Sequence, residues 1–191
     1  TVFYTTGTTG LPKGVYFSHR QLVLHTLGVA TAVGSAATHG RLHREDVYMP
    51  ITPMFHVHAW GFPYIATLLG LKQVYPGRYL PAALLQLINQ EKVTFSHCVP
   101  PIMQMLLTHP SSASVDLSGW KVLIGGSAMS PALARAALGR GIDVLTGYGM
   151  SETCPVLSIA HLHSDDLQAS PDQQAGLAAQ DGLLVGRCQT G

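Results

Sequence analysis

Charged side chains are scarce in this sequence. Aspartate, glutamate, lysine and arginine make up 11% of its 191 residues, whereas hydrophobic residues make up 47%. A soluble domain ordinarily carries about 25% charged residues, most of them on its surface. The shortage predicts that much of this chain is covered by other parts of a longer protein. The first residue is Thr1 rather than methionine, which agrees with an excised fragment.

Long basic runs and a paired cysteine framework are also missing. The formal net charge is +1 and no basic run exceeds two residues, so neither nucleic acid nor an anionic membrane surface is indicated as a partner. Cys98, Cys154 and Cys188 are odd in number and widely spaced, which fits neither a disulfide framework nor a zinc site. They fit a reducing compartment, and we therefore expect a cytoplasmic protein.

One long run without charged residues is present, between residues 49 and 71. It is long enough to span a bilayer. Prolines and histidines interrupt it, however, namely Pro50, Pro53, His56, His58 and Pro63. These residues are unfavourable in a membrane-spanning helix, and the run is predicted to be a buried segment of a soluble fold.

Threonine and glycine are concentrated near the start of the chain. Residues 4–15 contain four threonines, three glycines and Lys13 between two apolar runs. Glycine lets backbone N–H groups approach a ligand, threonine adds donors and lysine adds positive charge. This is the chemistry of a phosphate-binding loop, although a flexible loop without a ligand can have the same composition. The P-loop of kinases and GTPases is disfavoured, because Pro12 and Val15 stand where its pattern requires glycine.

Strand-like and helix-like segments alternate along most of the chain. We expect strands at residues 1–4, 15–17, 47–49, 73–75, 93–96, 121–124 and 142–146. Helices are expected from Ser18 onward, within residues 55–71 after their first turn and ending at Gly70, and at residues 81–90, 101–108 and 130–138. Residues 40–46 are expected to form a polar surface turn, and residues 161–180 an exposed helix or linker. The alternation predicts an α/β fold with mainly parallel sheets flanked by helices, whose ligands bind beyond the carboxyl ends of the strands.

A second motif follows the last of these strands. Residues 147–153 read Gly-Tyr-Gly-Met-Ser-Glu-Thr. Tyr148 can stack on a base, and Glu152 can hold Mg²⁺, a cation that prefers oxygen ligands. The alternative is a simple turn with an exposed glutamate. The nucleophile elbow of a serine hydrolase is disfavoured, because both this motif and the turn at 125–129 lack its final glycine.

Together these motifs resemble those of the acyl-adenylate-forming superfamily, which comprises acyl-CoA synthetases, non-ribosomal peptide adenylation domains and firefly-type luciferases. Residues 4–14 resemble its phosphate-binding signature, and residues 147–153 resemble its adenine- and magnesium-binding signature. Residues 53–56 are similar to its aromatic-histidine motif at the acyl site, and residues 125–127 to its Gly-Gly-small turn. Residues 16–20, 53–60 and 122–127 are most similar to the branch of medium- and long-chain fatty acyl-CoA synthetases.

The resemblance implies a two-step ligase reaction that uses ATP, Mg²⁺ and coenzyme A. A fatty acid is activated to acyl-AMP, and the thiol of coenzyme A then displaces AMP. Residues 1–160 are expected to form the central part of the AMP-binding N-terminal domain, and residues 161–191 a partly irregular continuation of the same domain. In this superfamily a ribose-binding aspartate, a hinge and a C-terminal domain with a catalytic lysine follow, so the 191 residues alone are expected to be inactive.

The resemblance also implies roles for individual residues. The β- and γ-phosphates of ATP are assigned to Thr6, Gly7, Thr8, Thr9, Gly10 and Lys13. Thr5 and Glu152 are expected to ligate Mg²⁺, and Tyr148 to stack on adenine. The remaining nucleotide-binding positions are Gly125, Gly126, Ser127, Thr146, Gly147, Gly149 and Thr153.

On the acyl side, His56 is expected beside the substrate carboxylate, with Thr153 donating to that carboxylate or to the α-phosphate. Trp60 and Gly126 are assigned to the acyl site. The apolar neighbours of Trp60, namely Met54, Phe55, Val57 and Phe62, are candidates for an acyl tunnel. Both His56 and this aromatic stripe have an alternative interpretation as ordinary packed side chains.

Several alternatives remain open from the sequence. The acid could instead be an aryl, short-chain or amino acid, and the chain could be a nucleotide-binding module without activity. The intact set Thr5, Lys13, His56, Tyr148 and Glu152 argues against a decayed site. The resemblance leaves room for a homodimer and for peripheral membrane association of the parent protein.

Overall fold

The computed structural model describes residues 1–5, 10–36, 38–162 and 165–179. Its centre is a six-stranded sheet in the order β4-β3-β5-β6-β7-β8. The strands are β3 (Val47–Pro50), β4 (Lys72–Gln73), β5 (Phe95–Cys98), β6 (Lys121–Ile124), β7 (Asp143–Gly149) and β8 (Val156–Ala160). The pairings are parallel except that of β8 with β7, which is antiparallel. The predicted α/β fold with a mainly parallel sheet is confirmed.

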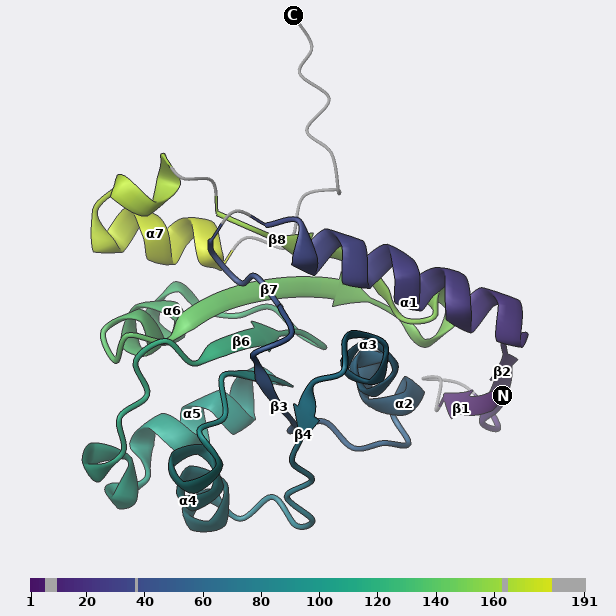
Figure 1. Cartoon of the computed structure of the whole chain (residues 1–191), viewed down its shortest axis with the longest axis horizontal. Helices are drawn as coiled ribbons and strands as arrows, with labels where there is room; N and C mark the ends of the chain where they lie inside the picture. Colours follow the sequence, from purple (N-terminus) through teal and green to yellow (C-terminus); the bar gives the residue numbers. More distant parts are fainter. Residues whose placement is uncertain (6–9, 37, 163–164, 180–191) are drawn as a thin grey trace, which may run out of the picture.

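Helices cover both faces of this sheet (Figure 1). They are α1 (His19–Gly34), α2 (Val57–Trp60), α3 (Phe62–Leu69), α4 (Pro81–Glu91), α5 (Pro100–Thr108), α6 (Pro131–Leu138) and α7 (Pro171–Ala178). Short 3₁₀ helices add η1 (Pro110–Ser114), η2 (Ser151–Thr153) and η3 (Asp166–Gln168). Figure 1 shows α1 running along one side, with α4 and α5 on the opposite side.

Alternation along the strands separates two hydrophobic cores. In β6, Val122 and Ile124 belong to the core beneath α4, α5, α6 and α7, whereas Leu123 belongs to the core beneath α1 and α3. Successive side chains of a strand point to opposite faces, so every internal strand of this sheet must be hydrophobic on both faces. This burial on both faces explains why the internal strands are continuous apolar runs in the sequence.

A separate hairpin precedes the sheet. Strands β1 (Val2–Thr5) and β2 (Lys13–Tyr16) pair antiparallel, with Thr5 opposite Lys13. The next helix, α1, begins with the expected capping box. The Ser18 hydroxyl accepts from the backbone N–H of Gln21 at 3.2 Å, and the Gln21 side chain accepts from the N–H of Ser18 at 2.8 Å.

The helix expected after the first turn of residues 55–71 is present, but it begins only at Phe62, later than predicted. The backbone of Val57, His58, Ala59 and Trp60 has φ between 46° and 58°, so this turn is left-handed. Gly61 at φ 77° reverses the chain, and α3 then runs to Gly70, where the predicted end is confirmed. Apolar composition predicted burial correctly here, but it carries no information on handedness. No helix in the described ranges is long and apolar enough to cross a membrane.

The expectation of an exposed segment after residue 160 is wrong in part. Helix α7 buries Ala175 and Ala178 in the same core as α6. Strand β8 was also missed. Its pairing with β7 depends on residues on the far side of the 147–153 motif, which no local pattern encodes.

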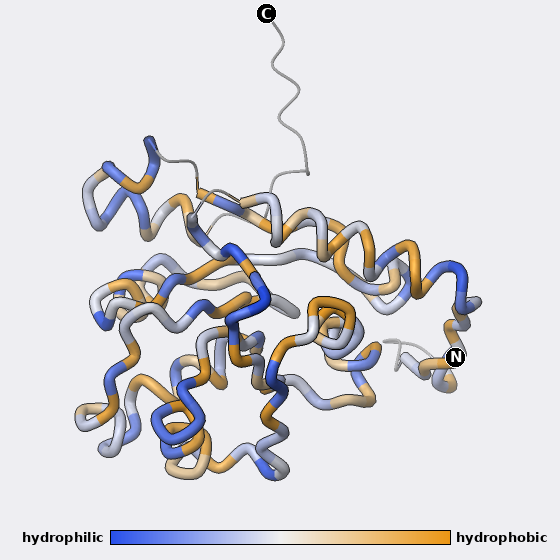
Figure 2. The backbone as a smooth tube through the Cα atoms, viewed as in Figure 1, coloured by the Kyte–Doolittle hydropathy of each residue, from blue (hydrophilic) through white to orange (hydrophobic). Residues whose placement is uncertain are grey.

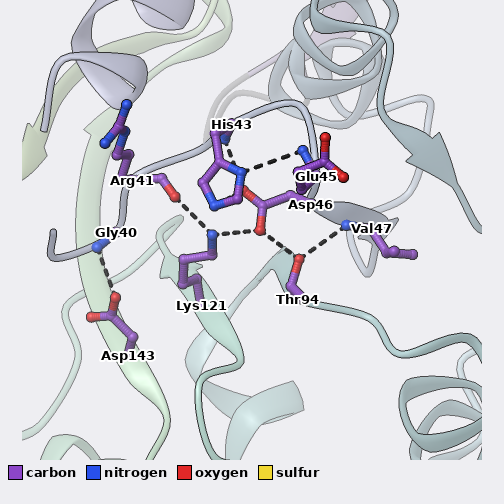
Figure 3. A network of polar contacts seen from close by, with 9 residues as sticks. All are labelled: Gly40, Arg41, His43, Glu45, Asp46, Val47, Thr94, Lys121 and Asp143. Carbon is purple, nitrogen blue, oxygen red and sulfur yellow. Dashed lines mark hydrogen bonds and ion pairs between the residues drawn. The ribbon is translucent and has the colours of Figure 1, made fainter.

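The expected polar surface turn before β3 is correct for Arg41, His43, Arg44 and Glu45, which are exposed, but wrong for Asp46. Residues 43–46 are a strongly hydrophilic stretch (Figure 2), yet Asp46 is only 3% exposed. Its carboxylate accepts from the Lys121 ammonium at 2.5 Å, from the Thr94 hydroxyl at 2.6 Å and from the N–H of His43 at 2.8 Å. Lys121 also donates to the carbonyl of Arg41 (Figure 3). This network joins the amino ends of β3, β5 and β6, at the edge opposite their carboxyl ends.

Replacement of Lys121 by methionine is expected to lower the free energy of unfolding by about 3 kcal/mol, because the buried Asp46 carboxylate loses its counter-charge. Urea denaturation monitored by circular dichroism measures the change. The matched control is Lys72→Met, which breaks the exposed ion pair with Glu91 and should cost less than about 1 kcal/mol. Equal losses in the two variants would contradict a stabilising role of the buried pair.

Candidate active site

A pocket of about 240 Å³ lies at the carboxyl ends of β6 and β7. Parallel sheets bind ligands at this edge, as expected from the sequence. The segment 56–60 and the start of β8 complete its wall. The lining residues are His56, Val57, Trp60, Leu123, Gly125, Gly126, Gly147, Tyr148, Gly149, Met150, Ser151, Pro155 and Val156.

The pocket brings together residues from three of the four motifs. His56 comes from the aromatic-histidine motif and Trp60 follows it four residues later, and two glycines come from the turn after β6. Gly147, Tyr148 and Gly149 come from β7, which extends into the second motif instead of ending at residue 146. Tyr148 lines the pocket and is 49% exposed, and an aromatic ring at such a position can stack on a ligand.

The remaining predicted residues lie around this pocket or outside the described ranges. Thr146 is buried in β7, Ser127 and Glu152 are exposed, and Thr153 is half-buried in η2. Lys13 and Gly10 are exposed on the hairpin side. Thr6, Gly7, Thr8 and Thr9 lie outside the described residues.

The turn after β6 requires glycine. A Cβ atom on Gly125 would lie 3.0 Å from the carbonyl oxygen of Gly147 and 3.2 Å from the indole of Trp60. Gly126 has φ of +80°, a conformation that side chains rarely adopt. The two glycines therefore allow the backbone of β6 to pass directly beside the indole of Trp60.

The left-handed turn of α2 sets the direction of both His56 and Trp60. Such a turn costs about 1–2 kcal/mol per residue for ordinary side chains, so surrounding contacts must hold it. The ring of His58 packs at 4.5 Å against Phe3 of the hairpin, and its Nδ1 lies 2.8 Å from the hydroxyl of Tyr64. Val57 is buried with Phe3, Phe17 and Cys154.

The same apolar cluster attaches the hairpin to the pocket. Phe3 and Phe17 of the hairpin side share this cluster with Val57, which lines the pocket. They also share it with Cys154, the residue after Thr153 of the second motif. Figure 1 shows β1 beside α2, although far from it in sequence. The hairpin that carries Thr5 and Lys13 is thus fixed next to the pocket by side-chain packing.

The hydroxyl of Thr153 is engaged within its own turn. It accepts from the N–H of Met150 at 3.0 Å and contacts the carbonyls of Met150 and Pro155. Donation to a phosphate or carboxylate, as the sequence suggested, requires this hydroxyl to exchange one of these partners.

The candidate residues of the acyl tunnel fall into three groups: pocket-lining, exposed and core residues. Val57 and Trp60 line the pocket, whereas Met54 and Phe55 are exposed and Phe62 is buried in the core beneath α3. For Phe62 the alternative of ordinary packing is therefore correct.

A second hollow, of about 260 Å³, lies between α1 and β8. It is lined by His25, Gly28, Val29, Ala32, Val156, Leu157, Ser158 and Ile159. We call it the α1–β8 groove. Val156 lines both hollows, and its N–H donates to Nε2 of His25 at 3.1 Å. Sequence patterns do not predict this groove, because its β8 wall forms only by pairing with β7.

One buried histidine near the pocket was also missed. His97 of β5 is fully buried, and its ring lies 5.1 Å from that of Trp60. Burial lowers the pKa of His97 from 6.5 to about 3, so the imidazole is neutral. A histidine within a strand expected to be internal to the sheet, and so buried on both faces, was the available signal.

Comparison with known proteins gives consistent results. Residues 1–182 match the family model of AMP-binding enzymes. The long-chain-fatty-acid–CoA ligase of Thermus thermophilus is 43% identical over 184 residues, 95% of this chain and 33% of the relative. The medium-chain-fatty-acid–CoA ligase of Ectopseudomonas oleovorans is 37% identical over 94% of this chain and 32% of the relative. The chain thus spans about a third of the length of these curated relatives.

A similar fold is found in the inhibitor-bound N-terminal domain of FACL13 from Mycobacterium tuberculosis. The TM-score is 0.74 at 26% sequence identity, and the match covers 95% of this chain and 43% of that domain.

The neutral state of His97 predicts a pH dependence of stability. The folded pKa of about 3 lies below the unfolded value of 6.5. The contribution of neutral His97 to the free energy of unfolding is therefore complete above pH 6.5. It is lost as the pH falls from 6.5 towards 3, with a slope of about 1.4 kcal/mol per pH unit. Urea denaturation between pH 4 and 8 should show a flatter dependence for His97→Asn than for the wild type. His19→Asn, at an exposed position, should keep the wild-type slope, and a wild-type slope in His97→Asn would exclude this origin.

Proposed function

Because the chain belongs to the family of AMP-binding enzymes, we propose that it forms part of a fatty acyl-CoA synthetase, an acid–thiol ligase. The carboxylate of a fatty acid attacks the α-phosphate of ATP, and pyrophosphate leaves. The thiol of coenzyme A then attacks the acyl carbon, and AMP leaves. The observation that carries this proposal is a single pocket in which Tyr148 and two glycine turns meet His56 and Trp60.

On the nucleotide side, the proposal gives the ring of Tyr148 the stacking contact with adenine. The turn at Gly125 and Gly126 has no side chain that would obstruct a base, so its backbone can approach closely. Lys13 supplies a positive charge from the hairpin for the phosphates. The carboxyl end of β7 thereby holds the base, and the hairpin holds the leaving pyrophosphate.

A magnesium ion bound with ATP would neutralise charge on the phosphate oxygens. In the part of the chain that the structure describes, no cluster of three or more His, Cys, Asp or Glu residues could hold a metal on its own. The carboxylate of Glu152 and the hydroxyl of Thr5 would hold the ion. These two oxygen donors fit Mg²⁺, which takes one or two protein ligands when phosphates supply the others.

On the acyl side, His56 is proposed to orient the carboxylate towards the α-phosphate. The alkyl chain then has two apolar spaces, the pocket beside Trp60 and the α1–β8 groove, which share Val156. Each buried CH₂ contributes about 0.8 kcal/mol, so the second space favours medium and long chains over aryl, short-chain or amino acids. The two fatty-acid–CoA ligases among the relatives support the same choice.

The cellular setting is part of the proposal. Cys98 and Cys154 are free thiols, as is usual in a reducing cytoplasm. The partners are the small-molecule substrates, whereas membrane association and a homodimer remain proposals without support from the contacts described. Residues 1–160 are proposed to be the central part of the N-terminal domain, with 161–191 continuing it.

The parent protein is expected to release pyrophosphate in the presence of ATP and a fatty acid. Acids from acetate to palmitate are compared, with benzoate and amino acids as controls. Highest kcat/KM for medium- or long-chain acids is expected. Activity only with amino acids would refute the fatty-acid assignment, and no activity with any acid would favour a binding module. The 191 residues alone, about a third of the length of the relatives, are expected to give no turnover.

The α1–β8 groove can be tested by filling it. Gly28 lines the groove, and a Cβ atom added to it meets nothing within 4 Å, so Gly28→Leu places a side chain at the groove wall. Leucine is a better helix former than glycine, so the fold is not weakened. We expect kcat/KM for palmitate to fall about tenfold relative to that for hexanoate, equivalent to about two lost CH₂ contacts.

Gly28→Ala is the matched control, because it gives the same helix stabilisation with little added volume. It should leave the ratio of the two acids unchanged. An unchanged ratio in Gly28→Leu would exclude the groove from the path of the acyl chain.

A further inference from the structure

The proposed reaction leaves the imidazole of His97 without a role. His97 lies near the carboxyl end of β5, between β3 and β6 in the sheet, and its side chain is fully buried. The ring packs against three aromatic rings. The centroid distances are 5.1 Å to Trp60, 5.2 Å to Phe62 and 5.7 Å to Tyr48.

Both ring nitrogens of His97 have hydrogen-bond partners. Nε2 lies 2.7 Å from the hydroxyl of Tyr48, and Nδ1 lies 3.0 Å from Oγ1 of Thr52. The Thr52 hydroxyl donates at 3.4 Å to the carbonyl oxygen of His97 itself. Thr52 therefore accepts from Nδ1–H, and the Tyr48 hydroxyl donates to Nε2. A single neutral tautomer of His97, protonated at Nδ1, is compatible with all of these hydrogen bonds.

This chain of hydrogen bonds ends beside the acyl site. Thr52 directly precedes the motif at residues 53–56 that carries His56, and the N–H of Ile51 donates to the carbonyl of His97 at 3.2 Å. On its face, the imidazole contacts the ring of Trp60, and the indole in turn lies over Gly125. His97 thus contacts both elements that present acyl-site residues, without lining the pocket itself.

We propose that His97 is a positioning residue for the acid-binding wall, holding the 53–56 segment through Thr52 and supporting the indole of Trp60 from below. This inference rests on the proposed function for its kinetic consequence. It adds a residue that touches neither substrate nor nucleotide, and whose effect concerns the acid alone. Tyr48, on the opposite side of the ring, stabilises the imidazole but does not contact the acyl motif.

The kinetic test uses the full-length parent protein. Thr52→Val removes the hydrogen bond on the acyl side, and Tyr48→Phe removes the one on the far side. For Thr52→Val and His97→Leu, KM for the acid should rise about two- to tenfold, with kcat and KM for ATP unchanged. Tyr48→Phe should leave KM for the acid within twofold of the wild type. In His97→Asn the side-chain amide can replace the Nδ1–H donor, so KM for the acid should return towards the wild-type value. Equal effects of Thr52→Val and Tyr48→Phe would overturn the proposal.

The structural test uses the full-length parent protein labelled with 5-fluorotryptophan, in which Trp60→Phe and Trp120→Phe assign the two resonances. The chain contains two tryptophans, Trp60 and Trp120, and Trp120 belongs to the opposite core, where its indole donates to Ser96. Fluorine NMR of His97→Leu should show a shifted Trp60 resonance and an unchanged Trp120 resonance, whereas general destabilisation moves both. An unmoved Trp60 resonance would refute the support of the indole by His97. If the parent protein activates no acid, the proposed function fails, and this spectrum still tests the role of His97.

Discussion

The left-handed turn at Val57–Trp60 has an unfavourable backbone, and contacts on several sides hold it in place. The hairpin presses Phe3 against His58 and buries Val57, and Tyr64 binds His58 from α3. Without these contacts, a cost of about 1–2 kcal/mol per residue would favour another conformation. His56 and Trp60 leave the two ends of this turn, so the shape of the pocket depends on the packing of the hairpin.

The two edges of the sheet have different requirements. At the amino edge, Asp46, Thr94 and Lys121 join the strands through a buried polar network. At the carboxyl edge, the backbone is left bare by Gly125, Gly126 and Gly147, and ring systems fill the space above it. The carboxyl edge does contain the neutral hydrogen bonds of His97 with Tyr48 and Thr52, but the Asp46–Lys121 ion pair that joins the strands lies at the amino edge, away from the glycine backbone that a nucleotide would approach.

Local signals were sufficient for most of the fold. The capping box at Ser18, the helix over Pro81–Glu91 and the strand Lys121–Ile124 each depend on residues close in sequence, and all were predicted. The handedness of residues 57–60 depends on Phe3, more than fifty residues away, and the burial of Asp46 depends on Lys121. Strand β8 exists only through its pairing with β7. Distant partners decide these features, and a single sequence does not show them.

The candidate site follows the same division. The motifs identified His56, Trp60, Tyr148 and the glycines, which the structure brings into one pocket. The α1–β8 groove and His97 were missed, because each results from contacts between elements. The four threonine and glycine positions at 6–9, which were assigned to phosphate binding, lie outside the described residues.

The alternation along β6 has an evolutionary consequence. Leu123 faces the pocket and one core, while its neighbours Val122 and Ile124 face the other core. Under the proposed function, substitutions of Leu123 would change the size of the acid that fits the pocket, while Val122 and Ile124 leave the packing of the opposite core unchanged. Substrate preference and fold stability can therefore evolve separately in proteins built on this sheet.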